Sequence, residues 1–132
     1  MHQAIVAVGS NFEAEANFQR AEAILTADGY FRGTVETITT EPVDYVDCGA
    51  FLNGAFWLET DLDFETFKAY LKSIEQRLGR VKGRKGHGPQ PMDLDIVVWD
   101  GAIVRDEFYT QDYTRRPVED AIARFGIPCQ IP

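Results

Sequence analysis

Two aspartates, Asp93 and Asp95, form the sharpest chemical feature of the sequence. They lie in the run 92–99 (MDLDIVVW), which predicts a strand, so their side chains share one face with backbones about 6 to 7 Å apart. Carboxylates this close repel each other unless a cation lies between them. Mg²⁺ binds through one or two carboxylates while phosphates and water complete its coordination. Two solvated aspartates on an exposed sheet face would give the same pattern, and the spacing alone favours that interpretation.

A basic, glycine-rich segment precedes this strand and favours a metal site over a pair of solvated aspartates. It holds these cations and glycines: Arg80, Lys82, Arg84, Lys85, Gly79, Gly83, Gly86 and Gly88. Paired carboxylates can hold metal ions on phosphate oxygens, while cations neutralise developing charge. Glycine lets the backbone approach phosphate closely. No P-loop or protein-kinase signature is present. The two segments together predict metal-dependent phosphoryl transfer.

Phe51 and Asn53 open the apolar run 51–59 and share one face of the strand that it predicts. An aromatic ring can stack on a flat heterocycle, and an amide can bind its edge. Ordinary sheet packing explains Phe51 as well. Asn53 is harder to explain structurally, because a buried amide needs hydrogen-bond partners.

Four strands are expected to carry these residues, at 4–8, 34–40, 51–59 and 92–99. Alternation in the third places Leu52, Phe56 and Leu58 on one face, and Phe51, Asn53, Ala55 and Trp57 on the other. Alternation in the fourth places Met92, Leu94, Ile96 and Val98 on one face, and Asp93, Asp95, Val97 and Trp99 on the other.

Two amphipathic helices separate the strands. Their apolar stripes are Phe18, Ala21 and Leu25 in the first, and Phe64, Phe67, Leu71, Ile74 and Leu78 in the second. Asn11 and Asp63 are the expected N-caps, and Gly29 and Gly79 the expected ends. A further short helix is expected near 119–125.

The resulting order, β-α-β-β-α-β, is that of a ferredoxin-like α+β fold with an antiparallel sheet. We expect both helices to cover one face of the sheet as one layer of an α/β sandwich. The opposite face, with Phe51, Asn53, Asp93 and Asp95, is then left for loops or a ligand.

Length and composition limit the other possibilities. The 132 residues predict one domain, 1–132, and the net charge of -8 argues against nucleic-acid binding. No apolar stretch is long enough to span a bilayer, and the N-terminus lacks a signal pattern. Cys48 and Cys129 show no metal-ligand spacing and are expected to be reduced, which favours a cytoplasmic location. The chain is expected to be a monomer.

An ordered set of short motifs resembles the 6-hydroxymethyl-7,8-dihydropterin pyrophosphokinase family over residues 5–100. The motifs are Gly9-Ser10-Asn11, Phe51-Leu52-Asn53, Ile74-Glu75, Leu78-Gly79-Arg80, Gly88-Pro89 and Asp93-Leu94-Asp95. The resemblance implies transfer of diphosphate from ATP to the hydroxymethyl group of the pterin in folate biosynthesis, with release of AMP. It also implies a ferredoxin-like fold and two Mg²⁺ ions between the ATP phosphates, Asp93 and Asp95.

The resemblance also implies roles for individual residues. The implied pterin pocket comprises Gly9, Thr40, Val43, Phe51 and Asn53. The implied ATP contacts are Glu75, Arg80, Lys82 and Arg115, and Arg80 and Asp95 are the implied catalytic residues.

The sequence departs from the family pattern after the basic segment. Gln90 stands where an arginine is typical and cannot supply its charge or planar fork. No histidine follows the last strand, and Pro117 or Val118 stands where an aromatic is expected, although Arg115 or Arg116 matches the family's arginine. The C-terminal cover is short.

Three interpretations follow from these departures. The leading one is the pyrophosphokinase, as one domain shortened at the C-terminus. The second is a weakened paralogue that binds pterin or nucleotide, or a diphosphokinase with a shifted acceptor. The third is a ferredoxin-like interaction domain unrelated to pterins.

Overall fold

One antiparallel sheet with helices against both of its faces forms the part of the chain that the structure, a computed structural model, describes: residues 1–40, 50–79 and 90–130. The elements in chain order are β1 His2–Ser10, α1 Ala14–Ala27, β2 Phe31–Thr34, β3 Ile38–Thr40, β4 Phe51–Thr60, α2 Phe64–Arg77, β5 Asp93–Trp99, β6 Ala102–Ile103, α3 Glu107–Thr110 and α4 Asp112–Phe125. No helix among these residues is long and apolar enough to cross a membrane.

The strand order is β2-β4-β1-β5-β6, and β3 also pairs with β4. β1 is therefore central, with β4 and β5 antiparallel to it on either side. This arrangement confirms the ferredoxin-like α+β fold expected from the element order.

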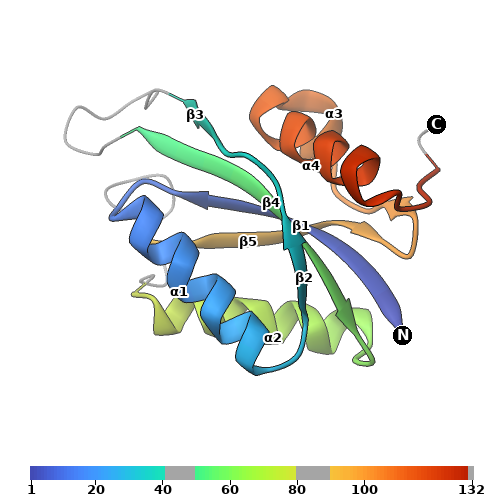
Figure 1. Cartoon of the computed structure of the whole chain (residues 1–132), viewed down its shortest axis with the longest axis horizontal. Coiled ribbons are helices and arrows are strands. Elements are labelled where there is room, and N and C mark those ends of the chain that lie inside the picture. Colours follow the sequence, from blue (N-terminus) through green and yellow to red (C-terminus); the bar gives the residue numbers. More distant parts are fainter. Residues whose placement is uncertain (41–49, 80–89, 131–132) are drawn as a thin grey trace.

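Helices α1 and α2 cover one face of the sheet (Figure 1). Phe18, Ala21 and Leu25 of α1 are buried there, as the stripe predicted, and so are Phe67, Leu71 and Ile74 of α2. Asp63 caps α2 as expected, because its Oδ1 accepts a hydrogen bond of 2.8 Å from the N–H of Thr66. Gly29 and Gly79 follow the helix ends at positive φ, as expected.

The predicted cap of α1 was wrong. Glu13 occupies the N-cap position, and its side chain makes no capping bond. Asn11 instead binds the chain just before β5: its N–H donates to the Gln90 carbonyl at 3.1 Å, and its Oδ1 accepts from the Gln90 N–H at 2.5 Å. A long-range partner thus uses the side chain that the helix would need.

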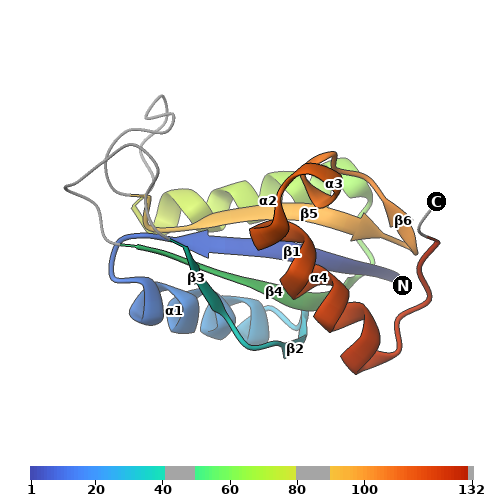
Figure 2. The same cartoon turned by 90° about the horizontal axis from the view of Figure 1, so that it is seen from above.

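Helix α4 packs on the opposite face of the sheet, where Figure 2 shows it lying across the strands. The sequence predicted only its second half, near 119–125. Pro117 lies inside the helix, and an interior proline usually indicates that a helix ends. Here Pro117 and Val118 are buried against the sheet, so packing outweighs the lost backbone hydrogen bond.

A β-bulge changes which face the end of β5 presents. Ile5 pairs with Val98 and Val6 with Ile96, so Val97 is an extra residue in β5. The predicted faces of Val98 and Trp99 were therefore wrong. Val98 packs under α4 with Val97, and Trp99 packs against the cluster beneath α1 and α2.

The expected strand 34–40 is correct only in part, because β3 covers its end while β2 begins at Phe31 and shares only Thr34 with the expected range. The two strands, divided at residues 35–37, pair with the two ends of β4. The division lies where α4 crosses the edge of the sheet. A Cβ on Gly33 would come within 2.6 Å of the Phe125 ring, and Val35 is buried in the core beneath α4. Helix docking therefore interrupts a sequence rich in β-branched residues.

Candidate active site

The sheet face beneath α4 changes from apolar to polar along its strands. At one end Ile5, Ala55 and Val97 form part of a buried core. At the other end Gly9 pairs with Asn53 on one side and with Asp93 on the other. Antiparallel pairing therefore gathers an amide and a carboxylate around a residue without a side chain.

A cavity of about 260 Å³ lies over this polar end, beneath α3 and α4. Its lining residues are Ala7, Val8, Gly9, Asn53, Gly54, Asp93, Asp95, Arg105, Glu107, Gln111, Tyr113 and Thr114. The small residues on β1 form its floor, and the charged and amide groups surround it. Such a cavity suits a polar ligand, and an anionic group could bind there only if Arg105 or a metal ion offset the three carboxylates of the lining.

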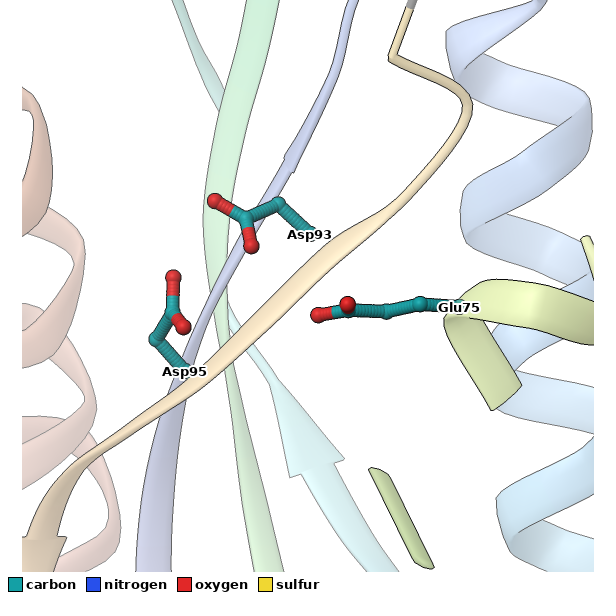
Figure 3. A group of neighbouring side chains, drawn as sticks. All are labelled: Glu75, Asp93 and Asp95. Carbon is teal, nitrogen blue, oxygen red and sulfur yellow. The ribbon is translucent and has the colours of Figure 1, made fainter. Parts of the chain in front are cut away.

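Three carboxylates lie close together beside this cavity, and two of them, Asp93 and Asp95, line it (Figure 3). Asp93 and Asp95 project from one side of β5, and Glu75 reaches toward the strand from α2. Ligand oxygens of the three residues lie within 4.8 Å of one another. Three hard oxygen donors at this separation fit Mg²⁺, so these residues could hold the ion that the resemblance implies.

Side chains of α2 bind the edge of β5 that β6 leaves unpaired. Among the described residues β5 pairs with β6 only at Val98 and Trp99, and no described strand pairs with this edge of β5 at Leu94. Glu75 Oε2 accepts from the Leu94 N–H at 2.7 Å, and Lys72 Nζ donates to the Leu94 carbonyl at 3.2 Å. These two contacts explain why Glu75, although buried, lies beside the strand that carries the aspartates.

Two cations balance the charge of Asp95. Lys72 Nζ lies 3.0 Å from Glu75 Oε2 and 3.1 Å from Asp95 Oδ1, and Arg105 Nη1 lies 3.7 Å from the same Asp95 oxygen. Burial alone would raise the pKa of Asp95, but Lys72, Arg105 and a hydrogen bond with Asp93 outweigh it and lower that pKa. Burial likewise works against the charged form of Lys72, but Asp95 and Glu75 outweigh it and raise its pKa.

The residues expected to bind the pterin fall into three groups. Gly9 and Asn53 line the cavity, and the Asn53 Nδ2 donates to Thr40 Oγ1 at 3.0 Å, which fixes the amide. Phe51 pairs with Thr40 across β3 and β4 but is not among the described residues lining the cavity. Val43 lies outside the described residues.

The residues expected to bind ATP are also divided. Glu75 lies at the carboxylate cluster. Arg80 and Lys82, with the rest of the basic segment, lie outside the described residues. Arg115 lies on α4, ion-paired with Asp112 and, at 3.5 Å, with Glu119, and it does not line the cavity as described.

Sequence reasoning missed several residues of the site, above all Lys72, Arg105, Glu107 and Tyr113. Lys72 precedes Glu75 by three residues, a spacing that places both on one helix face, so a signal for it existed. Arg105 and Glu107 follow the β5–β6 hairpin with no recognisable motif, and their Nε–Oε2 distance is 3.2 Å. Tyr113 lies in the first half of α4, which the sequence pattern did not predict because Pro117 is typical of a helix end.

A smaller cavity, of about 80 Å³, lies on the other side of Asp95, between α2 and the edge of β5. It is lined by Phe64, Lys68, Leu71, Lys72, Leu94, Asp95, Ile96, Val104 and Arg105. Its walls combine apolar side chains, among them Phe64 and Leu71, with charged ones, among them Lys68 and Lys72.

Sequence comparison decides the family to which this site belongs. The sequence model of the family 7,8-dihydro-6-hydroxymethylpterin-pyrophosphokinase (HPPK) matches residues 5–123. The chain belongs to the HPPK family. This result confirms the resemblance inferred from the ordered motifs, and it extends through most of α4.

Named relatives agree with the HPPK assignment. The chain is 31% identical over 115 residues to "Folate synthesis bifunctional protein, mitochondrial" of Pisum sativum, covering 86% of this chain and 22% of the relative. It is 30% identical over 108 residues to "2-amino-4-hydroxy-6-hydroxymethyldihydropteridine pyrophosphokinase" of Bacillus subtilis, covering 79% of this chain and 64% of the relative. The chain thus spans about a fifth of the pea protein's length and less than two thirds of the bacterial protein's.

Proposed function

We propose that this domain transfers the diphosphate group of ATP to the hydroxymethyl group of 6-hydroxymethyl-7,8-dihydropterin and releases AMP, as a step of folate biosynthesis. Membership of the HPPK family supports the reaction class. The observation that carries the proposal is the grouping of Glu75 with Asp93 and Asp95, two aspartates that line the same cavity as Asn53. On this proposal, the site for metal ions and phosphate adjoins the site for a polar heterocycle.

Asn53 is the proposed anchor for the pterin ring. Its side chain is almost fully buried and held by Thr40, so its amide presents a fixed edge. Asn53 Oδ1 would lie 3.6 Å from a Cβ built on Gly9, which shows that the oxygen faces the glycine. A pterin edge offers both donors and acceptors to such an amide. Val43 and Phe51 complete the proposed pocket.

The reaction forms a bond between the hydroxymethyl oxygen and the β-phosphorus of ATP. The bond from that phosphorus to the oxygen bridging the α-phosphate breaks, AMP leaves with the electron pair, and the hydroxyl proton passes to solvent. Mg²⁺ held by Asp93 and Asp95, with Glu75 beside them, would neutralise phosphate charge in this step. Arg80 is proposed to stabilise the developing charge, and Lys82 and Arg115 to bind ATP.

One observation favours a second candidate, a paralogue that binds pterin or nucleotide with little turnover. Both backbone polar groups of Gln90 are held by Asn11, at a position where the family pattern has arginine. Pro117 and Val118 lie on the buried face of α4 and offer no aromatic ring to the cavity. A diphosphokinase with a different acceptor would fit the same departures.

The deciding experiment is AMP release from ATP and the pterin, with and without Mg²⁺. We expect metal-dependent AMP matched by pterin diphosphate, and a loss of at least about 100-fold in Asp95→Asn with the fold intact by circular dichroism. Asp120→Asn, an exposed aspartate of α4, is the matched control and should retain activity. Metal-independent turnover, or full activity of Asp95→Asn, would reject the metal assignment. Pterin binding without AMP release would indicate the paralogue.

Three finer expectations belong to the same proposal: two Mg²⁺ ions at the site, a monomeric protein and a cytoplasmic location. Cys129 is a free thiol in the described part of the chain, and free thiols persist in a reducing compartment. Inductively coupled plasma analysis of the complex with a nucleotide analogue would count the ions, and light scattering would give the mass.

A further inference from the structure

The larger and the smaller cavity meet at two residues. Among the described residues, only Asp95 and Arg105 line both. One cavity contains Asn53 and the other has apolar walls from Phe64 and Leu71. If acceptor and donor occupy opposite sides of Asp95, the transferred group lies at this junction.

Arg105 is held at the junction by its surroundings. One residue earlier, the N–H of Val104 donates to the Val97 carbonyl at 2.8 Å, and the Arg105 carbonyl accepts from the Phe108 N–H at 3.2 Å. The guanidinium lies between Asp95 and Glu107, at 3.7 Å and 3.2 Å, while 38% of the side chain is exposed to solvent. The backbone is therefore anchored, and the guanidinium is accessible to a ligand.

The charge around the junction requires a cation if a phosphate chain is to bind. Carboxylates predominate in the larger cavity, where Asp93, Asp95 and Glu107 accompany a single described cation, Arg105. Lys72 already contacts Glu75, Asp95 and the Leu94 carbonyl. Gln90 contributes no charge. A guanidinium can bind two phosphate oxygens at once, which an amide cannot do with a matching charge.

We propose that Arg105 is a catalytic residue of this chain that binds the transferred diphosphate where the two cavities meet, and that it supplies the positive charge missing at Gln90. The inference rests on the proposed function. As the hydroxymethyl oxygen bonds to the β-phosphorus and AMP departs with the electron pair of the broken P–O bond, the guanidinium stabilises the negative charge on the diphosphate oxygens. Phosphate replaces Asp95 as its partner, which leaves the carboxylate to a metal ion.

Nucleotide binding without turnover provides the first test. The probe is α,β-methylene ATP, in which a methylene group replaces the oxygen whose bond would break. Titration calorimetry with this analogue and Mg²⁺ should show about tenfold weaker binding to Arg105→Met than to the wild type. Arg105→Lys should recover part of the loss. The matched control is Arg32→Met. Arg32 is also ion-paired, to Glu59 at 2.7 Å, and its side chain is 33% exposed, but it lies on β2 at the other edge of the sheet.

Binding of Mn²⁺ alone gives a readout of opposite sign. Removing the guanidinium beside Asp95 removes a repulsive charge, so Arg105→Met should bind Mn²⁺ several-fold more tightly by electron paramagnetic resonance. If Arg105 had only a structural role, its replacement would weaken the binding of both Mn²⁺ and the nucleotide analogue. In turnover, kcat should fall about 100-fold.

Unchanged analogue binding and kcat in Arg105→Met would overturn the proposal, as would a wild-type protein that binds no nucleotide analogue. Failure of the proposed function is distinct from both outcomes. In that case the wild type releases no AMP with the pterin, yet the analogue and Mn²⁺ still respond to Arg105→Met in opposite directions, and Arg105 is assigned to nucleotide binding.

Discussion

The two faces of the sheet are made from alternate residues of the same strands, but they are used differently. The face beneath α1 and α2 is apolar along its length, from Ala4, Val6 and Val8 on β1 to Phe56 and Leu58 on β4. The face beneath α4 is apolar only where Ile5, Trp57 and Val97 lie. Beyond them it carries the polar end with Asn53 and the aspartates.

This difference indicates that the residues that stabilise the fold and those that line the cavity are separated along the strands of one face, and not simply between the two faces. α4 closes the apolar half, where Phe125 stacks on Trp57 with ring centroids 5.0 Å apart. The beginning of the same helix covers the cavity with Tyr113 and Thr114. Substitutions should therefore separate into those that change unfolding and those that change ligand binding.

The largest effect on stability is expected from the closed face. Phe67→Ala removes a fully buried ring between Tyr30, Tyr70 and Trp99 and should lower the free energy of unfolding by about 3 to 5 kcal/mol, measured by urea denaturation. The folded fraction should keep its KM values. Phe12→Ala, at an exposed phenylalanine, is the control. A loss below about 1 kcal/mol would contradict the assignment of this face as the main source of stability.

A smaller effect, on binding, is expected at the open half. Tyr113 is 40% exposed and lines the cavity, so its ring can contact a flat acceptor. Tyr113→Ala should raise the KM for the pterin about fivefold, equivalent to about 1 kcal/mol, with little change in unfolding. Tyr113→Phe should behave as the wild type. Tyr109→Ala, 47% exposed and outside the cavity lining, is the matched control, and an equal effect there would remove the assignment.

The smallest effect is a pH dependence of stability from Asp95. Its pKa is lower in the folded than in the unfolded protein, so its contribution is present above the unfolded value, near pH 3.9, and is lost as pH falls through the folded value. In metal-free urea titrations, wild-type stability should fall more steeply below about pH 4 than that of Asp95→Asn. Parallel curves would show that Lys72 and Arg105 do not stabilise the carboxylate.

Much of the fold follows from local patterns. The helix stripes, the Asp63 cap and the faces of Leu52, Phe56 and Leu58 depend on periodicity and nearest neighbours, and all are confirmed. The faces of Val98 and Trp99 were wrong because strict alternation cannot reveal a bulge. The first half of α4 was missed because tertiary packing tolerates Pro117 inside it.

The candidate site was also predictable only in part. Strand alternation brings Asp93 and Asp95 to one face, and pairing with β1 brings them near Asn53. The contacts of Lys72 and Arg105 with Asp95 depend on how α2 and the β5–β6 hairpin dock, which the local sequence does not encode. The roles of Arg80, Lys82 and Val43 stay predictions.

The contacts of α2 with Leu94 have a consequence for association between molecules. An open strand edge can pair with a strand of another chain and begin aggregation. At Leu94 both backbone groups are already bound, the N–H by Glu75 and the carbonyl by Lys72. An incoming strand would have to displace both side chains, so the groups beside the carboxylate cluster also hinder intermolecular β-pairing at this edge.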